Sequence, residues 1–291
     1  MTMKYETITA NKDYDKLYYL LKDNSFSEAY LSKLRQNKEN LLINNSPANM
    51  RSKVNKGDVV SFALDVGKKT EIAVCEMDLD IVYEDDFLLV INKPPLLAST
   101  PTKSHFSYNL AGGVCAYMNK KTNNFVYRIL NRLDKDTSGL VLIAKSPFSY
   151  QNTTKIEKTY EAVCEGDISS PLTIDKPIYT ENINGVNTLK RIISPLGKEA
   201  TTFVSPIKSG TNFSHISLKL IHGRTHQIRV HLSSIGHPLV GDMVYGQKSE
   251  LISHTALICK KISFVHPKTK EKMSFEAQYP ESISNLLKHI V

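Results

Sequence analysis

The chain has 291 residues, which is enough for one large domain or for two. Its hydrophobic fraction of 41% with 23% charged residues is ordinary for a soluble globular protein, and no apolar run approaches the ~18 residues that a membrane span requires. The formal net charge of +8 favours an acidic partner, with nucleic acid as the first candidate.

The first residues, MTMKYETITANKDYDK, lack the apolar stretch of a secretory signal. The four cysteines are scattered without a C-x-x-C pair, and Cys75 and Cys164 lie in apolar, strand-like runs. We expect reduced thiols in the core, neither disulfides nor a zinc site, and hence a cytoplasmic protein.

Residues 14–63 predict a small α+β unit. The run DKLYYLLKD places Leu17, Leu20 and Leu21 at helical spacing, and a second helix follows, with Ser25 and Glu28 spaced as in a capping box. The runs LLINN and DVVSFAL then predict short strands.

Basic residues accompany this small unit. Residues 1–70 hold 12 Lys and Arg against 8 Asp and Glu. The pattern resembles the αL RNA-binding motif first known from a small-subunit ribosomal protein, and an ordinary α+β cap remains the alternative. We expect residues 1–70 to be a domain that binds RNA through Lys33, Arg35, Arg51 and Lys53.

Residues 71–81 are predicted to be a linker, and residues 82–291 a larger domain. Short strands and turns dominate there, as in LVLIAKS, KTYEAVCEG, TTFVSPI and HISLKLI. The expected fold class is α+β, with a mostly antiparallel sheet and few helices.

Metal binding is not expected. His222, His226 and His231 lie close together in the sequence, but their spacing does not suit a zinc helix and no acidic neighbour completes a ligand set. Arg229 in the same stretch lies at the edge of an apolar stripe on a helix that is predicted between Gly223 and Gly236. A guanidinium there needs an anionic partner, and Asp134 is the candidate, with a neighbouring loop as the alternative.

Residues 129–140, ILNRLDKDTSGL, place Asp134 and Asp136 just before an apolar strand. Asp136, followed by Thr-Ser-Gly, fits a turn role. A lone Asp134 would also be a turn or cap residue more often than a catalytic one. Taken together, the residues indicate a candidate catalytic acid, an arginine that needs an anionic partner and a basic module that could bind RNA. They do not identify a reaction.

Four stretches resemble the RluA-type pseudouridine synthases, which isomerise uridine in RNA. They are YEDDFLLVINKPP, RLDKDTSGLVLIAKS, KTYEAVCEG and GRTHQIRVHLSSIGHPLVGDMVYG. The chain departs from the common family pattern at Asn131, where many members have His, in KPPLL, which lacks a glycine, and at Ile258 and Cys259. Many members that modify large-subunit ribosomal RNA carry an N-terminal αL domain, which residues 14–63 of this chain resemble.

The resemblance implies roles for individual residues. Asp134 would be the catalytic aspartate, acting as nucleophile or as base. Tyr160 would pack on the uracil or take the proton from its carbon 5, Arg229 would pair with Asp134, and Arg132 would lie near the target nucleotide. No cofactor and no metal is implied, and we expect a monomer that acts on RNA without a membrane partner.

The most favoured target is 23S ribosomal RNA, and transfer RNA is the alternative substrate. A non-catalytic factor that binds ribosomal RNA and a glycosidase are the rivals from other classes. The first would not require Asp134, Tyr160 and Arg229 together, and the second generally needs a second carboxylate.

Overall fold

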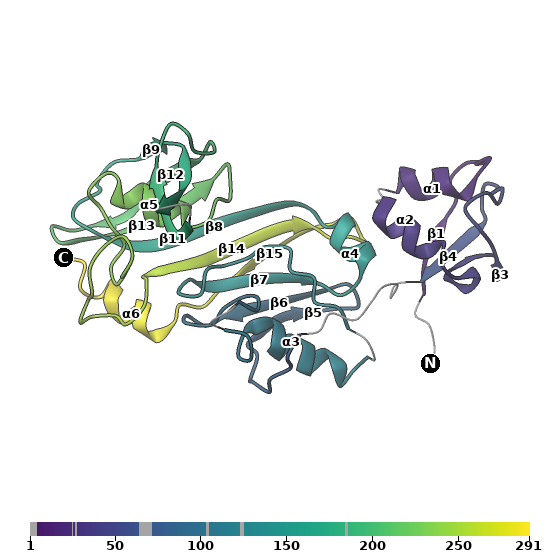
Figure 1. Ribbon diagram of the computed structural model, residues 1–291, viewed down its shortest axis with the longest axis horizontal. Coiled ribbons are helices and arrows are strands. Elements are labelled where there is room, and N and C mark those ends of the chain that lie inside the picture. The colour runs from purple at the N-terminus through teal and green to yellow at the C-terminus, as the bar shows by residue number, and fades with distance from the viewer. Residues whose placement is uncertain are drawn as a thin grey trace.

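The computed structural model describes residues 5–24, 26, 28–63, 72–102, 105–122, 125–183 and 186–291. Their buried apolar side chains form one core near the N-terminus, two more cores farther along the chain and a small fourth cluster. The first core belongs to a small unit at one end of the elongated molecule (Figure 1). The expected domain boundary at residue 70 lies outside the described residues.

The small unit is a four-stranded antiparallel sheet with two short helices. The strands have the order β1-β4-β2-β3, and a one-turn helix precedes β2. Leu17, Leu20 and Leu21 of α1 are buried, as their spacing predicted. Ser25 of the expected capping box lies outside the described residues. The elements are β1 (Tyr5–Thr9), α1 (Leu17–Asp23), α2 (Glu28–Leu34), β2 (Leu41–Ile43), β3 (Ser46–Pro47) and β4 (Val59–Ala63).

A long, twisted sheet forms the larger unit. Within the described residues its strand order is β5-β6-β7-β14-β8-β13-β12-β9, with β15 paired to β14. Neighbouring strands are antiparallel except for β7 and β14, which run parallel. Its strands are β5 (Ile81–Glu84), β6 (Leu88–Lys93), β7 (Ser138–Ala144), β8 (Thr154–Glu165), β9 (Leu172–Asp175), β12 (Thr201–Ser209), β13 (Phe213–Leu220), β14 (Leu257–Val265) and β15 (Lys272–Glu276).

The middle of this sheet is covered on both faces. Leu89 and Ile91 of β6 belong to one core and Leu88 and Val90 to the other, as expected when alternate side chains point to opposite faces. The remaining elements are α3 (Leu110–Asn119), α4 (Pro147–Asn152), the hairpin β10 (Ile178–Ile183) and β11 (Val186–Ile193), α5 (Gln227–Ser233) and α6 (Glu281–Leu287). The predicted α+β class with a mostly antiparallel sheet is confirmed.

Gly139 allows β7 and β14 to join. Its φ is +103°, and a Cβ atom there would lie 2.4 Å from the backbone oxygen of Cys259. Only glycine accepts both the backbone angle and this close approach. The Thr-Ser-Gly sequence before the apolar run is therefore the point at which the two parallel strands meet.

An aromatic side chain connects the two units. Phe148 of α4 packs against Phe26 and Phe62 of the small unit, with ring centroids 5.8 and 5.4 Å away. Lys268 of the larger unit also pairs with Glu6 of β1. Figure 1 shows α4 at the end of the larger unit that faces the small one.

The cysteines follow the expected pattern only in part. Cys115, Cys164 and Cys259 are free and buried, whereas Cys75 is only partly buried and lies outside any strand, contrary to expectation.

Every helix in the described ranges is too short or too polar to cross a membrane.

Candidate active site

A cleft of about 560 Å³ lies between the turn before β7, strand β8 and the turn that leads into α5. Asp134, Tyr160 and Arg229, which are far apart in the sequence, all line it. Arg132 lines it as well and is exposed to solvent. The fold therefore gathers in one place the four residues that the sequence singled out.

The turn that carries Asp134 is fixed from both sides. The Asn131 side chain donates to the Leu140 carbonyl (2.9 Å) and accepts from the Leu142 amide (2.7 Å) of β7. The Ser99 hydroxyl donates to the Leu133 carbonyl (2.6 Å). Because Asn131 bonds the backbone at both of its amide atoms, the sequence departure at this position preserves a rigid turn.

Lys93 supports the same turn from below. Its ammonium is buried and donates to the carbonyls of Pro94 (2.9 Å), Leu97 (2.8 Å) and Lys135 (3.2 Å). Burial lowers the pKa of Lys93 to about 7, although Asp136 and Asp134 act in the opposite direction. Lys93 thus ties the carbonyls of Pro94 and Leu97 to that of Lys135, next to the two carboxylates.

Tyr160 lies on β8, opposite Cys259 of β14. The side chain is 7% exposed. Burial, with smaller contributions from Cys259 and the Asp134 charge, raises the pKa of Tyr160 well above its usual value. The phenol is therefore protonated at neutral pH.

Arg229 does not form the expected ion pair with Asp134. Its Nε and Nη2 atoms donate to Asp242 at 2.6 and 2.7 Å, and both side chains are almost completely buried. Burial raises the pKa of Asp242, but the hydrogen bonds and charge of Arg229 outweigh it, so that the pKa lies below its usual value. Asp242 is the nearer and better enclosed carboxylate, and it takes both prongs of the guanidinium.

Arg229 is also more buried than predicted, and the helix that carries it is shorter than predicted. α5 begins at Gln227, four residues after Gly223, and His226 just before it has a left-handed backbone with φ of +57°. Arg224 donates to the Glu199 carbonyl, which directs the preceding loop away from a helical path. Such a backbone is uncommon outside glycine and is enriched at functional sites.

His226, which was weighed from the sequence only as a metal ligand, is the one basic side chain among the described residues with a nitrogen within 4.0 Å of the Asp134 carboxylate. Its Nε2 lies 3.9 Å from Asp134 Oδ2. Burial lowers the pKa of His226, Asp134 raises it, and Arg229 and Arg191 lower it further. The imidazole is therefore neutral at neutral pH.

Tyr245 lies within hydrogen-bonding distance of His226. The Tyr245 hydroxyl accepts from the Arg191 backbone amide (2.7 Å), and His226 Nδ1 lies 3.0 Å from the same oxygen. If the hydroxyl donates to Nδ1, the imidazole proton is on Nε2, facing Asp134. Asp242 and Tyr245 were not singled out from the sequence, although both stand in the stretch LVGDMVYG, where an acid follows apolar residues and needs a partner.

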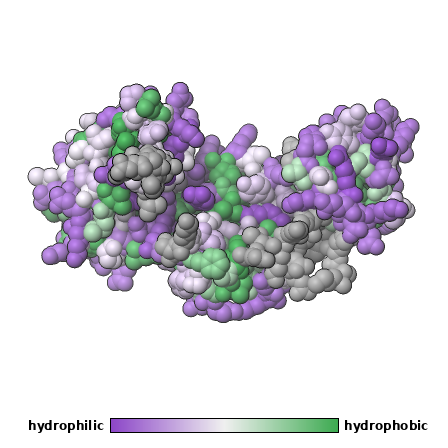
Figure 2. All heavy atoms as spheres, in the orientation of Figure 1, coloured by the Kyte–Doolittle hydropathy of each residue, from purple (hydrophilic) through white to green (hydrophobic). Residues whose placement is uncertain are grey.

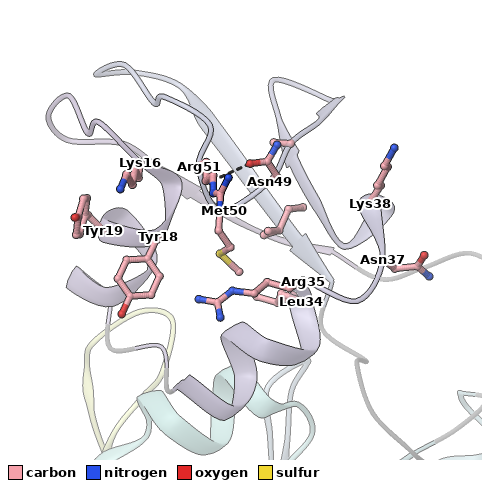
Figure 3. A pocket seen from close by; sticks show the side chains of 12 residues that line it. Lys16, Tyr18, Tyr19, Leu34, Arg35, Asn37, Lys38, Asn49, Met50 and Arg51 are labelled. Atoms are coloured by element: carbon pink, nitrogen blue, oxygen red, sulfur yellow. Dashed lines mark hydrogen bonds between the residues drawn. The ribbon is translucent and has the colours of Figure 1, made fainter.

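Three of the four residues that were expected to bind RNA line hollows on the surface. Arg35 and Arg51 line one on the small unit itself, together with Lys16 and Tyr18 (Figure 3). Lys33 lines another, where α2 faces α4. Lys53 is exposed in the loop before β4. In the described part of the chain no group of His, Cys, Asp or Glu is arranged to hold a metal ion.

The larger unit has the fold of pseudouridylate synthases. It resembles the human RNA pseudouridylate synthase domain containing 1, with a TM-score of 0.56 and 23% identity over 74% of this chain and 87% of that one. The sequence profile described as RNA pseudouridylate synthase matches residues 87–234.

The chain therefore belongs to the RNA pseudouridylate synthase family and is an isomerase of RNA uridine. It is 33% identical to the uncharacterized RNA pseudouridine synthase YjbO of Bacillus subtilis (strain 168), over 90% of this chain and 94% of that protein. It is 32% identical to the ribosomal large subunit pseudouridine synthase D of Neisseria meningitidis serogroup A, over 85% of this chain and 71% of that protein. The RluA-type assignment made from the four motifs is confirmed.

Proposed function

We propose that this enzyme converts specific uridines of 23S large-subunit ribosomal RNA to pseudouridine, with Asp134 as the catalytic aspartate. The observation that carries the proposal is the cleft in which Asp134 and Tyr160 meet on rigid elements. The names of the ribosomal relatives support the choice of RNA.

The reaction breaks the base–ribose bond, turns the uracil and rejoins it through carbon 5. Asp134 either attacks carbon 1′, which forms a covalent ribose ester, or removes the proton at carbon 2′, which leaves a glycal. In both routes the bonding electrons leave with the uracil, and a proton is later lost from carbon 5. The Asp134 side chain is 29% exposed, so it can reach a substrate that enters the cleft.

The other cleft residues have supporting roles. Since burial keeps the Tyr160 phenol protonated, its surroundings favour packing on the uracil over taking the carbon 5 proton. Arg229, held by Asp242, supplies a fixed positive field to Asp134. The exposed Arg132 at the cleft can fill the gap that the flipped nucleotide leaves in the RNA.

The small unit is proposed to be an αL-type RNA-binding domain. Arg35 and Arg51 line a hollow on its surface together with Tyr18 and Tyr19, and the Arg35 guanidinium lies 5.8 Å from the centroid of the Tyr18 ring (Figure 3). Cations beside aromatic rings are typical of surfaces that bind RNA backbone and bases. Hydrophilic side chains cover much of the visible face of this unit (Figure 2).

The test is the release of tritium from ribosomal RNA that carries 5-tritiated uridine. Asp134→Asn should fold, bind RNA and release no tritium, because an amide neither attacks carbon 1′ nor takes a proton. Asp136→Asn is the matched control in the same turn and should keep most activity. Substantial release by Asp134→Asn would remove the aspartate from the mechanism.

Two alternatives have distinct outcomes. An enzyme for transfer RNA would release tritium from transfer RNA and not from ribosomal RNA. A non-catalytic binding factor would bind RNA without release from any substrate, and Asp134→Asn would behave as wild type.

A further inference from the structure

A second groove adjoins the catalytic cleft. It encloses about 830 Å³ along the ends of β8, β13, β14 and β15. The groove and the cleft share three lining residues, Lys158, Leu220 and Gly223. The groove and the cleft therefore meet at these residues.

The strand register places groove residues in one row across the sheet. Phe203 of β12 is opposite Lys219 of β13, Lys219 is opposite Thr159 of β8, and Thr159 is opposite Lys261 of β14. All four residues line the groove. Since neighbouring strands are about 4.8 Å apart, the backbones at Lys219 and Lys261 are roughly 10 Å apart, with Phe203 one strand farther out.

The charge of the groove is strongly positive. Lys158, Lys219, Lys261 and Lys272 line the groove, against one carboxylate, Glu157. Lys272 and Glu157 form an exposed ion pair at 3.8 Å, which water screens. Lysines on the sheet thus give the groove an excess of three positive charges.

The groove also exposes apolar surface among these cations. Phe203 is 43% exposed and Ile221 is 61% exposed. An aromatic face next to a row of cations is suited to an unpaired nucleotide, whose base stacks while its phosphates meet the lysines.

We propose that this groove binds the single-stranded RNA directly next to the target uridine, with a base on Phe203 and phosphates at Lys219 and Lys261. The proposal rests on the proposed function, because a uridine that is flipped into the cleft leaves its neighbours unpaired or unstacked. Stacking and phosphate contacts carry little sequence information, so the groove adds affinity and sets the direction of the strand.

The binding test uses a fluorescein-labelled oligouridylate and fluorescence anisotropy over a series of salt concentrations. Lys219→Gln/Lys261→Gln should bind several-fold more weakly, and its salt dependence should be flatter by about 1.4, since each lost contact to a single strand contributes about 0.7. Phe203→Ala should weaken binding about ten-fold with an unchanged slope. Lys198→Gln/Lys288→Gln is the matched charge control, because both lysines are exposed and line neither the groove nor the cleft. Leu196→Ala is the control for an exposed apolar side chain.

The kinetic test uses full-length protein and ribosomal RNA from cells that lack the gene. The groove variants should raise KM and leave kcat and the melting temperature unchanged. Binding and KM values equal to those of the control variants would overturn the proposal and leave the groove to an acidic protein partner. A wild-type protein that releases no tritium from any RNA would refute the proposed function instead, while the anisotropy series still decides whether the groove holds RNA.

Discussion

Replacing Asp242 by asparagine should cause a large loss of stability. Asp242 is fully buried, and its carboxylate accepts two hydrogen bonds from Arg229 and two from the backbone amides of Val244 and Tyr245. Asp242→Asn keeps the shape but leaves a buried guanidinium without its counter-charge. Removing one partner of a buried pair costs about 3–5 kcal/mol.

Urea unfolding measures this loss. With a slope of about 3 kcal/mol per molar urea, the midpoint should fall by about 1 M or more. Glu276→Gln is the control, because the pair between Lys260 and Glu276 is 64% exposed on the glutamate side and its loss should cost less than about 1 kcal/mol.

A double-mutant cycle separates the pair from its surroundings. Arg229→Gln leaves the opposite charge unpaired and should be similarly destabilised, whereas Arg229→Gln/Asp242→Asn should lose clearly less than the sum. Losses that add within about 0.5 kcal/mol would mean that the two groups do not interact in solution, which would refute the reasoning.

The acid limb of the stability curve gives an independent check. Arg229 holds the folded-state pKa of Asp242 below its usual value, so this carboxyl contributes stability above the unfolded pKa of about 3.9. That contribution is lost as the pH falls through the lower, folded pKa. The difference between wild type and Asp242→Asn should therefore be constant near neutrality and shrink in acid.

Three further changes have defined outcomes. Gly139→Ala should unfold the larger unit at lower temperature by calorimetry, because its Cβ would meet the Cys259 backbone at 2.4 Å. Lys93 has a pKa of about 7 in the folded protein, below its unfolded value of about 10.4. The stability of the wild type in urea should therefore rise between these two pH values relative to that of Lys93→Met. Parallel stability curves for the two proteins would show that Lys93 is hydrated. Tyr245→Phe should allow His226 to move its proton to Nδ1, which nitrogen-15 chemical shifts report, and an unchanged tautomer would contradict the assigned hydrogen bonds.

Periodicity predicted much of the secondary structure. The leucines of α1 recur at helical spacing, and in β13 the buried Ile216 and Leu218 alternate with Ser217 and Lys219. Both patterns reflect a simple rule, that one face of each element meets a core. The start of α5 did not follow from such a rule. The helix was expected to begin after Gly223, but contacts of Arg224 with Glu199 and of His226 with Tyr245 hold the backbone of this stretch elsewhere.

The partner of Arg229 could not be predicted from the sequence, for a related reason. A buried arginine predicts an acid, and both Asp134 and Asp242 satisfy that requirement chemically. The choice depends on which carboxylate is deprived of water, and this is decided when the loop after α5 folds back over the helix. Asp242 is fully buried there, whereas the Asp134 side chain remains 29% exposed.

This arrangement leaves Asp134 free to react. A two-pronged contact from Arg229 would occupy both carboxylate oxygens and would have to break before either reached a ribose. With Asp242 in that place, the two prongs of Arg229 leave the Asp134 oxygens unoccupied, and His226 Nε2 lies 3.9 Å from Asp134 Oδ2, beyond hydrogen-bonding distance. The carboxylate is thus partly exposed and is not held by a strong hydrogen bond. A nucleophile and a base both need an accessible oxygen, so the geometry suits Asp134 for either of the two routes.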